Sequence, residues 1–131
     1  MGFSSELACA DVTADRGERE KPRRRRSSIT YDLHVRGRGR IHVTLGRYAD
    51  GRLCELFINA SKTGSDVRTA YECWAMTASK ALQHGLPARE LARAIRSVRD
   101  GSGGVITSPP QLAERMATSI WDALAQLIEQ T

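Results

Sequence analysis

Three short segments that alternate apolar and polar residues constrain the fold of this chain more than any other feature. Residues 28–35 and 41–45 alternate in this way, and residues 53–59 are apolar on both faces around Leu56-Phe57-Ile58. A period of two residues is typical of a strand with one buried face, and the third segment is typical of a strand that is covered on both faces. Turns at Gly37-Arg38-Gly39 and Asp50-Gly51 separate the segments. Because these connections are short, the three strands are predicted to be antiparallel neighbours.

Three amphipathic segments follow the strands and predict helices over residues 65–83, 88–98 and 110–130. Their apolar residues recur at spacings of three and four, which places them on one face of each helix. Gly85 and Pro87 end the first helix, and Pro109 or Pro110 begins the third. Strands followed by helices indicate an α+β domain over residues 27–131, with an antiparallel three-stranded sheet and three helices packed on one face. The outer face of the sheet is then polar, with Thr30, Asp32, His34, His42 and Thr44.

The positive charge is concentrated in one part of the chain. The 131 residues carry a net charge of +5, and residues 23–52 hold nine arginines against two aspartates. The polar, charged composition of residues 1–26 predicts a disordered basic N-terminal tail. An arginine run binds backbone phosphates of nucleic acids by counterion release, and a solvated tail is the alternative interpretation. The arginines available for such contacts are Arg23, Arg24, Arg25, Arg26, Arg36, Arg38, Arg40 and Arg47.

Two segments are candidates for binding an anion. Lys62-Thr63-Gly64-Ser65 forms a turn that opens the first helix, where free backbone N–H groups and the helix dipole favour negative charge. A plain helix cap explains the same residues without a ligand. The second segment, residues 100–108, contains Gly101, Gly103 and Gly104, followed by Thr107. Glycines allow close approach of the backbone to a ligand, and a flexible connector is the alternative.

Other classes of function receive little support from the sequence. Cys9, Cys54 and Cys73 are odd in number and form no CxxC pair, and the three histidines are scattered. These residues predict neither a metal site nor a cofactor, and they favour a reduced cytoplasm. No Ser-His-Asp set or pair of carboxylates recurs at catalytic spacing, so we expect no enzyme activity. No apolar run approaches the roughly 20 residues of a membrane span.

Five short motifs occur in an order and spacing that are shared with a known family. They are the arginine-rich start RRRRSSITYDLHV; Tyr48-x-Asp50-Gly51; Lys62-x-Gly64-Ser65; Ser79-x-x-Leu82-Gln83-x-Gly85-x-Pro87; and Ser119-Ile120-x-Asp122. In these motifs the chain, from about residue 25 to 127, resembles the TSCPD domain. That domain is found near the C-terminus of vitamin B12-dependent (class II) ribonucleotide reductases and in small stand-alone bacterial and phage proteins.

The chain also departs from the family pattern. It has no Thr-Ser-Cys-Pro-Asp motif near its C-terminal end, so any redox or metal role of the family cysteines is absent. The catalytic barrel of the reductase, with its radical cysteine and paired redox cysteines, has no counterpart in 131 residues. The resemblance therefore implies a context of nucleotide metabolism or nucleic acids without reductase activity.

The resemblance and the two anion segments together predict a non-catalytic nucleotide- or phosphate-binding module, which would be able to sequester a nucleotide. The alternative is a nucleic-acid-binding accessory protein that uses the arginine cluster. The predicted ligand-binding residues are Lys62, Thr63, Gly64, Ser65, Gln83, Gly101, Gly103, Gly104 and Thr107.

A homo-oligomer, a dimer or larger, is the last expectation from sequence. The first and third predicted helices carry apolar residues outside their main stripe, namely Cys73, Met76, Trp121, Ala125 and Ile128. A small domain with a second apolar helix face is typical of a two-fold dimer built by those helices.

Overall fold

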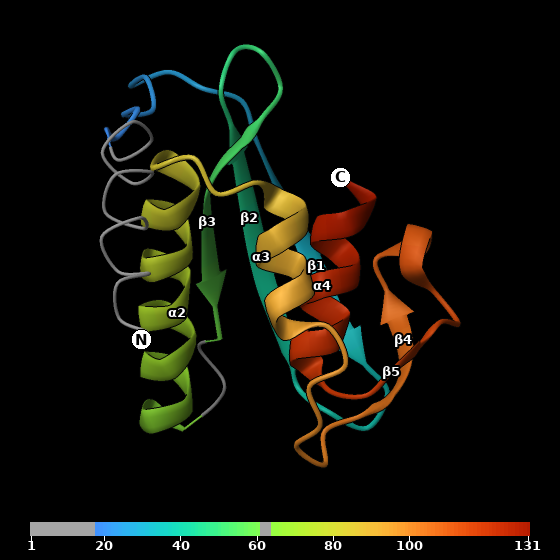
Figure 1. Cartoon of the computed structure of the whole chain (residues 1–131). Coiled ribbons are helices and arrows are strands. Elements are labelled where there is room, and N and C mark those ends of the chain that lie inside the picture. The colour runs from blue at the N-terminus through green and yellow to red at the C-terminus, as the bar shows by residue number, and fades with distance from the viewer. Residues whose placement is uncertain (1–17, 61–63) are drawn as a thin grey trace, which may run out of the picture.

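A computed structural model describes residues 18–60 and 64–131 of the chain (Figure 1). The α+β class is confirmed: a curved antiparallel sheet is packed against helices. Its elements in chain order are β1 Ser28–Val35, β2 Arg40–Arg47, β3 Leu53–Asn59, α2 Ser65–Gln83, α3 Ala88–Ile95, β4 Gly104–Ser108, the 3₁₀ turn η1 Pro110–Leu112, β5 Met116–Ala117 and α4 Ile120–Gln130.

The sheet has five strands in the order β3-β2-β1-β4-β5, so the prediction of three strands was wrong. The first three strands pair as the short turns predict, with Tyr31 opposite Val43 and Leu45 opposite Leu56. The missed strand β4 lies in the second half of the glycine-rich segment and pairs with the other edge of β1, through Val35 and Ile106. An unpaired edge strand exposes a row of backbone groups, and β4 pairs with those at the C-terminal end of β1, at His34 and Val35.

The third helix is shorter than predicted, because the chain makes η1 and β5 before it. Ser119 is the N-cap of α4, and its hydroxyl oxygen accepts the N–H of Asp122 at 3.1 Å. Pro110 begins only the 3₁₀ turn. The second helix ends at Ile95 instead of residue 98, since Ser97 adopts a positive φ of 68°. A non-glycine residue with that backbone conformation does not continue a helix.

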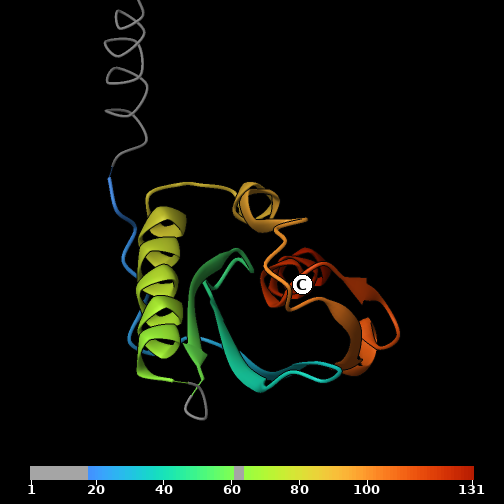
Figure 2. The same cartoon turned by 90° about the horizontal axis from the view of Figure 1, so that it is seen from below.

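The helices cover the sheet in two ways. Figure 2 shows the sheet curving beneath α4, whose residues 122–128 are all buried. Helix α2 lies along β3, which is an edge strand. The Ser79 hydroxyl accepts the N–H of Leu56 at 2.9 Å and donates to its carbonyl oxygen at 3.1 Å, and Gln83 Nε2 donates to the carbonyl of Cys54 at 3.0 Å. Side chains of α2 thus close an edge that would otherwise pair with another chain.

Residues 18–27, which include part of the predicted tail, contact the rest of the domain in the structure. The carbonyl of Ser27 accepts the N–H of Arg47 at 3.0 Å, which extends the β1–β2 pairing. Further back, the N–H of Glu20 donates to the carbonyl of Gln83 at 2.8 Å. The segment therefore runs from the hairpin between β2 and β3 to the C-terminal end of α2.

The apolar residues that motivated the dimer prediction are largely used inside the monomer. Ala125 and Ile128 are buried within the core. Trp121 stacks against Tyr71, with ring centroids 5.0 Å apart, and meets Trp74 edge-on at 5.4 Å. Met76 and Cys73 remain exposed on α2. The homo-oligomer stays a prediction, with fewer residues behind it.

Candidate functional site

The turn between β2 and β3 is the centre of the candidate site. The N–H of Gly51 donates to the carbonyl of Tyr48 at 2.9 Å, and the N–H of Tyr48 donates to the carbonyl of Arg52 at 2.9 Å. Gly51 has a φ of +95°, which a side chain would strain. The Asp50-Gly51 pair thus forms the tight hairpin turn that the sequence predicts.

A network of polar contacts ties the N-terminal segment to this turn. Arg52 Nη2 donates to Glu20 Oε1 at 2.9 Å, and Arg52 Nε donates to Asp50 Oδ2 at 2.8 Å. The Arg52 guanidinium also lies 4.6 Å from the centre of the Tyr48 ring, and the Tyr48 hydroxyl donates to the carbonyl of Glu20. Backbone and side-chain hydrogen bonds from Arg52 lower the pKa of Asp50. Burial and the Glu20 charge raise the pKa of Tyr48, which therefore stays a neutral hydrogen-bond donor.

Arg26 anchors the same segment through a second ion pair. Its Nε and Nη2 donate to the two carboxylate oxygens of Glu55, the latter at 3.0 Å. The Glu55 side chain is only 9% exposed and that of Arg26 is 28% exposed. The hydrogen bond with Glu55 raises the pKa of Arg26. A Cβ on Gly46, opposite Glu55 in the sheet, would lie 2.8 Å from Glu55 Cγ, so glycine leaves the space that the carboxylate fills.

These contacts create a pocket of about 480 Å³, which we call the cationic pocket. Its charged lining consists of five cations and two carboxylates: Lys21, Arg23, Arg25, Arg26, Arg47, Glu20 and Asp50. Both carboxylates bind Arg52, which lies outside the pocket lining, and Arg26 binds Glu55. Among the described residues, no carboxylate lies within 4 Å of the charged groups of the other four cations. The pocket therefore has an excess of positive charge that a bound anion would balance.

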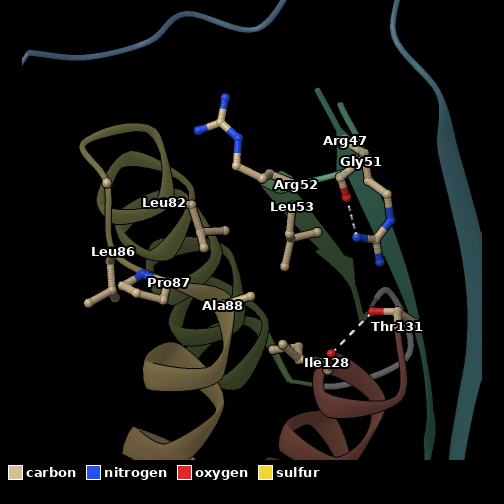
Figure 3. A pocket seen from close by; sticks show the side chains of 11 residues that line it. Arg47, Gly51, Arg52, Leu53, Leu82, Leu86, Pro87, Ala88, Ile128 and Thr131 are labelled. Carbon is tan, nitrogen blue, oxygen red and sulfur yellow. Dashed lines mark hydrogen bonds between the residues drawn. The ribbon is translucent and has the colours of Figure 1, made fainter. Parts of the chain in front are cut away.

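A second pocket, of about 410 Å³, adjoins the first and is lined mainly by apolar side chains. Figure 3 shows this apolar pocket, with Leu53, Leu82 and Ile128 converging from β3, α2 and α4. Its wall, between the end of α2 and the start of α3, consists of Leu86, Pro87 and Ala88. Arg47 and Gly51 line both pockets, and Arg47 Nη1 donates to the carbonyl of Gly51 at 3.0 Å (Figure 3). The two pockets thus meet at the hairpin turn.

The family model for the TSCPD domain matches residues 13–131. The chain belongs to the TSCPD domain family. It is 34% identical over 105 residues to a protein named vitamin B12-dependent ribonucleotide reductase from Bradyrhizobium diazoefficiens, and 31% identical over 105 residues to one of the same name from Agrobacterium fabrum. Each match covers 80% of this chain and 8% of the relative. No solved structure matches the chain.

The TSCPD domain does not bring all the predicted ligand-binding residues together. Gly64 is the N-cap of the 19-residue helix α2 and Gln83 is its last residue, so about 28 Å separates them. The buried side chain of Gln83 binds the Cys54 carbonyl and Arg19. Ser65 is the first residue of α2, whereas Lys62 and Thr63 lie outside the described residues.

The glycine-rich segment has structural roles in the TSCPD domain. A Cβ on Gly103 would lie 2.7 Å from the carbonyl oxygen of Thr118, so glycine permits a close backbone approach. The hydroxyl oxygen of Ser102 accepts the N–H of Ile120 at 3.0 Å, which satisfies a free donor at the start of α4. The carbonyl of Gly101 accepts a hydrogen bond from Arg38. Gly104 begins β4, and Thr107, also in β4, contacts His34.

The arginines predicted to contact nucleic acid form two separate groups. Arg23, Arg25, Arg26 and Arg47 line the cationic pocket, and Arg24 is exposed beside it. The other group, Arg36, Arg38 and Arg40, lies at the β1–β2 turn. Strand β2 runs from Arg40 to Arg47, so about 23 Å separates the two groups.

Sequence reasoning missed several residues of the candidate site. Glu20, Tyr48 and Arg52 position the cationic pocket, and the apolar pocket was not predicted. The Tyr48-x-Asp50-Gly51 motif was a usable signal, because it recurs in the family resemblance and forms the turn between the two pockets. The contact of Glu20 with Arg52 joins residues 32 apart and leaves no local pattern.

Proposed function

We propose that this TSCPD domain is a non-catalytic binding module for a phosphorylated small molecule, with a nucleotide as the ligand class. The observation that carries the proposal is the cationic pocket, in which Lys21, Arg23, Arg25 and Arg47 have no carboxylate partner among the described residues. The nucleotide class is supported by the relatives, which are named ribonucleotide reductases.

The chemistry of the pocket favours phosphate over other anions. Guanidinium groups form paired hydrogen bonds with phosphate oxygens, and lysine adds a point charge. The pocket is concave, with a volume in the usual range for small-molecule sites. Arg26 and Arg52 are occupied by carboxylates, so they hold the frame of the pocket while the other four cations face the ligand.

The pocket lining supports binding without turnover. Its carboxylates, Glu20 and Asp50, are held by Arg52, and Tyr48 donates its hydroxyl proton to a backbone carbonyl. A module that binds a nucleotide and leaves it intact would act by sequestering or sensing it.

Nucleic-acid binding remains the second candidate, because Arg23, Arg25 and Arg47 would also fit a phosphate of a polynucleotide. The distance to the second arginine group favours the small ligand, since a continuous polynucleotide track would require cations along the surface between the groups. A polynucleotide contact would also show the steep salt dependence of counterion release.

Calorimetric titration with nucleoside mono-, di- and triphosphates tests the proposal, and two neighbouring arginines provide a matched pair. Arg25 lines the cationic pocket and Arg24 does not. We expect Arg25→Gln to weaken nucleotide binding about tenfold, equivalent to about 1.4 kcal/mol, and Arg24→Gln to weaken it less than twofold. The proposal fails if no nucleotide binds below about 1 mM, where the binding free energy is only about −4 kcal/mol. Equal weakening by both variants would assign the effect to overall charge and favour the polynucleotide.

A further inference from the structure

The cationic pocket and the apolar pocket have opposite chemistry and a common boundary. One is lined largely by cations and the other mainly by aliphatic side chains, and Arg47 and Gly51 belong to both. Neither pocket alone matches a nucleotide, which carries charged phosphates at one end and, at the other, a base with flat, apolar faces. Together the pockets present both surfaces to one ligand.

The apolar pocket has a rigid floor and an accessible rim. Leu53, Leu82 and Ile128 form the floor and belong to the buried core, so their positions are fixed by packing. Leu86, on the rim, is 38% exposed and contributes less to the core. Burying apolar ligand surface against such a floor removes it from water, which favours binding of a ring with apolar faces.

Arg47 occupies the boundary in a defined orientation. Its Nη1 donates to the carbonyl of Gly51, in the same turn that Asp50 and Arg52 hold in place. A guanidinium fixed in this way presents its other N–H donors without losing further side-chain freedom on binding. Arg47 is therefore placed to contact the part of a ligand that joins its charged group to its uncharged group.

We infer that the two pockets form one bipartite site for a nucleotide, with its phosphates in the cationic pocket and its nucleoside against the apolar pocket. Arg47 lies between the two parts. This inference rests on the proposed function, since it assigns the nucleoside half of the same site. It predicts that the apolar pocket, and not the phosphates, discriminates between a nucleotide and an inorganic phosphate compound.

Comparing inorganic pyrophosphate with nucleoside diphosphates separates the contributions of the two pockets. Both kinds of ligand carry two phosphoryl groups, but only the nucleoside diphosphates carry a nucleoside. Calorimetry on the full chain would compare pyrophosphate with ADP, GDP, CDP and UDP. We expect at least one nucleoside diphosphate to bind tenfold or more tightly than pyrophosphate. This comparison requires no variant and therefore does not depend on the folding of one.

A matched pair of variants assigns the difference to the apolar pocket. Leu86→Ser changes the rim of the pocket, while Val98→Ser changes a side chain of similar exposure, 36%, beyond the far end of α3 and outside the pocket. We expect Leu86→Ser to weaken the preferred nucleoside diphosphate about fivefold and to leave pyrophosphate unchanged. Val98→Ser should change neither affinity. Far-UV circular dichroism checks that both variants are folded.

The outcomes distinguish this inference from the proposed function. If pyrophosphate and all four nucleoside diphosphates bind equally, the bipartite site is refuted while phosphate binding stands. If Leu86→Ser weakens the binding of pyrophosphate as much as that of the nucleotide, the substitution affects the fold and not a contact with the nucleoside. That result also refutes the inference. If neither kind of ligand binds, the proposed function and the inference fail together.

Discussion

Replacing Arg26 with glutamine tests how the N-terminal segment is attached to the domain. The substitution removes both hydrogen bonds from the guanidinium to Glu55, whose side chain is 9% exposed. Removing one partner of a fully buried ion pair costs about 3–5 kcal/mol, because the remaining charge is left without compensation. Since the Arg26 side chain is 28% exposed, water reaches the site and reduces this cost. We expect the free energy of unfolding to fall by about 1–3 kcal/mol.

The assay is urea unfolding at neutral pH, followed by the fluorescence of Trp74 and Trp121, which are partly buried against the core and contact each other. Arg24→Gln is the control, because it removes the same charge two residues away without removing an ion pair among the described residues. The double variant Arg26→Gln/Glu55→Gln removes the buried charge as well. It should be more stable than Arg26→Gln alone, by about 1 kcal/mol in a double-mutant cycle.

Two results would refute this reasoning. If Arg26→Gln and Arg24→Gln unfold at the same urea concentration, the ion pair does not stabilise the fold. If the double variant is the least stable of the set, the cost comes from lost packing and not from an uncompensated carboxylate. The same variant also bears on function, because Arg26 holds the segment that places Arg23 and Arg25 in the cationic pocket.

Further predictions concern the other end of the domain. Burial alone would raise the pKa of Asp122, but hydrogen bonds from the N–H groups of Ser97 and Thr118 and from Arg96 lower it overall. A depressed pKa in the folded state stabilises the protein at pH values above the unfolded pKa of about 3.9. In thermal melts, Asp122→Asn should therefore be less stable than the wild type at pH 7 and approach it below about pH 4. A difference in melting temperature that stays constant with pH would contradict this. Gly103→Ala should cost about 1–3 kcal/mol in urea unfolding, because its Cβ would lie 2.7 Å from a backbone oxygen, whereas Gly39→Ala, with open space around it, should change stability by less than about 0.5 kcal/mol. Equal melting of the two alanine variants would remove the packing role of Gly103.

The fold was predictable from sequence wherever the pattern was local. The strands at residues 28–35, 41–45 and 53–59 and the helix over 65–83 carry clear periods and turn residues, and the structure confirms them. Strand β4 was missed because three glycines in four residues favour a loop, whereas pairing with the free edge of β1 decides its conformation. The start of α4 had a local signal, since Ser119 followed by Asp122 is typical of a helix N-cap, but Pro110 offered an earlier start.

The candidate site was predictable in composition and not in geometry. The excess of arginines in residues 23–52 pointed to an anion, and the structure gathers four of them in one pocket. Their grouping depends on contacts between distant residues, such as Arg26 with Glu55, 29 positions apart. A local sequence pattern does not contain that pairing. Anion binding at Gly64 and at Gly101, where sequence reasoning placed the ligand, stays a prediction. The cationic pocket lies elsewhere in the domain.

Mapping a bound phosphate by nuclear magnetic resonance tests the central claim most directly. Inorganic pyrophosphate would be titrated into the ¹⁵N-labelled full chain, and backbone amide shifts would be followed together with the arginine Nε–Hε signals. The account predicts that the largest shifts fall on Lys21, Arg23, Arg25, Arg26 and residues 47–51, which line the cationic pocket. It also predicts that Arg25→Gln reduces these shifts while Arg24→Gln does not. Shifts centred on residues 62–65 and 101–107 instead would contradict the account and return the ligand to the segments predicted from sequence.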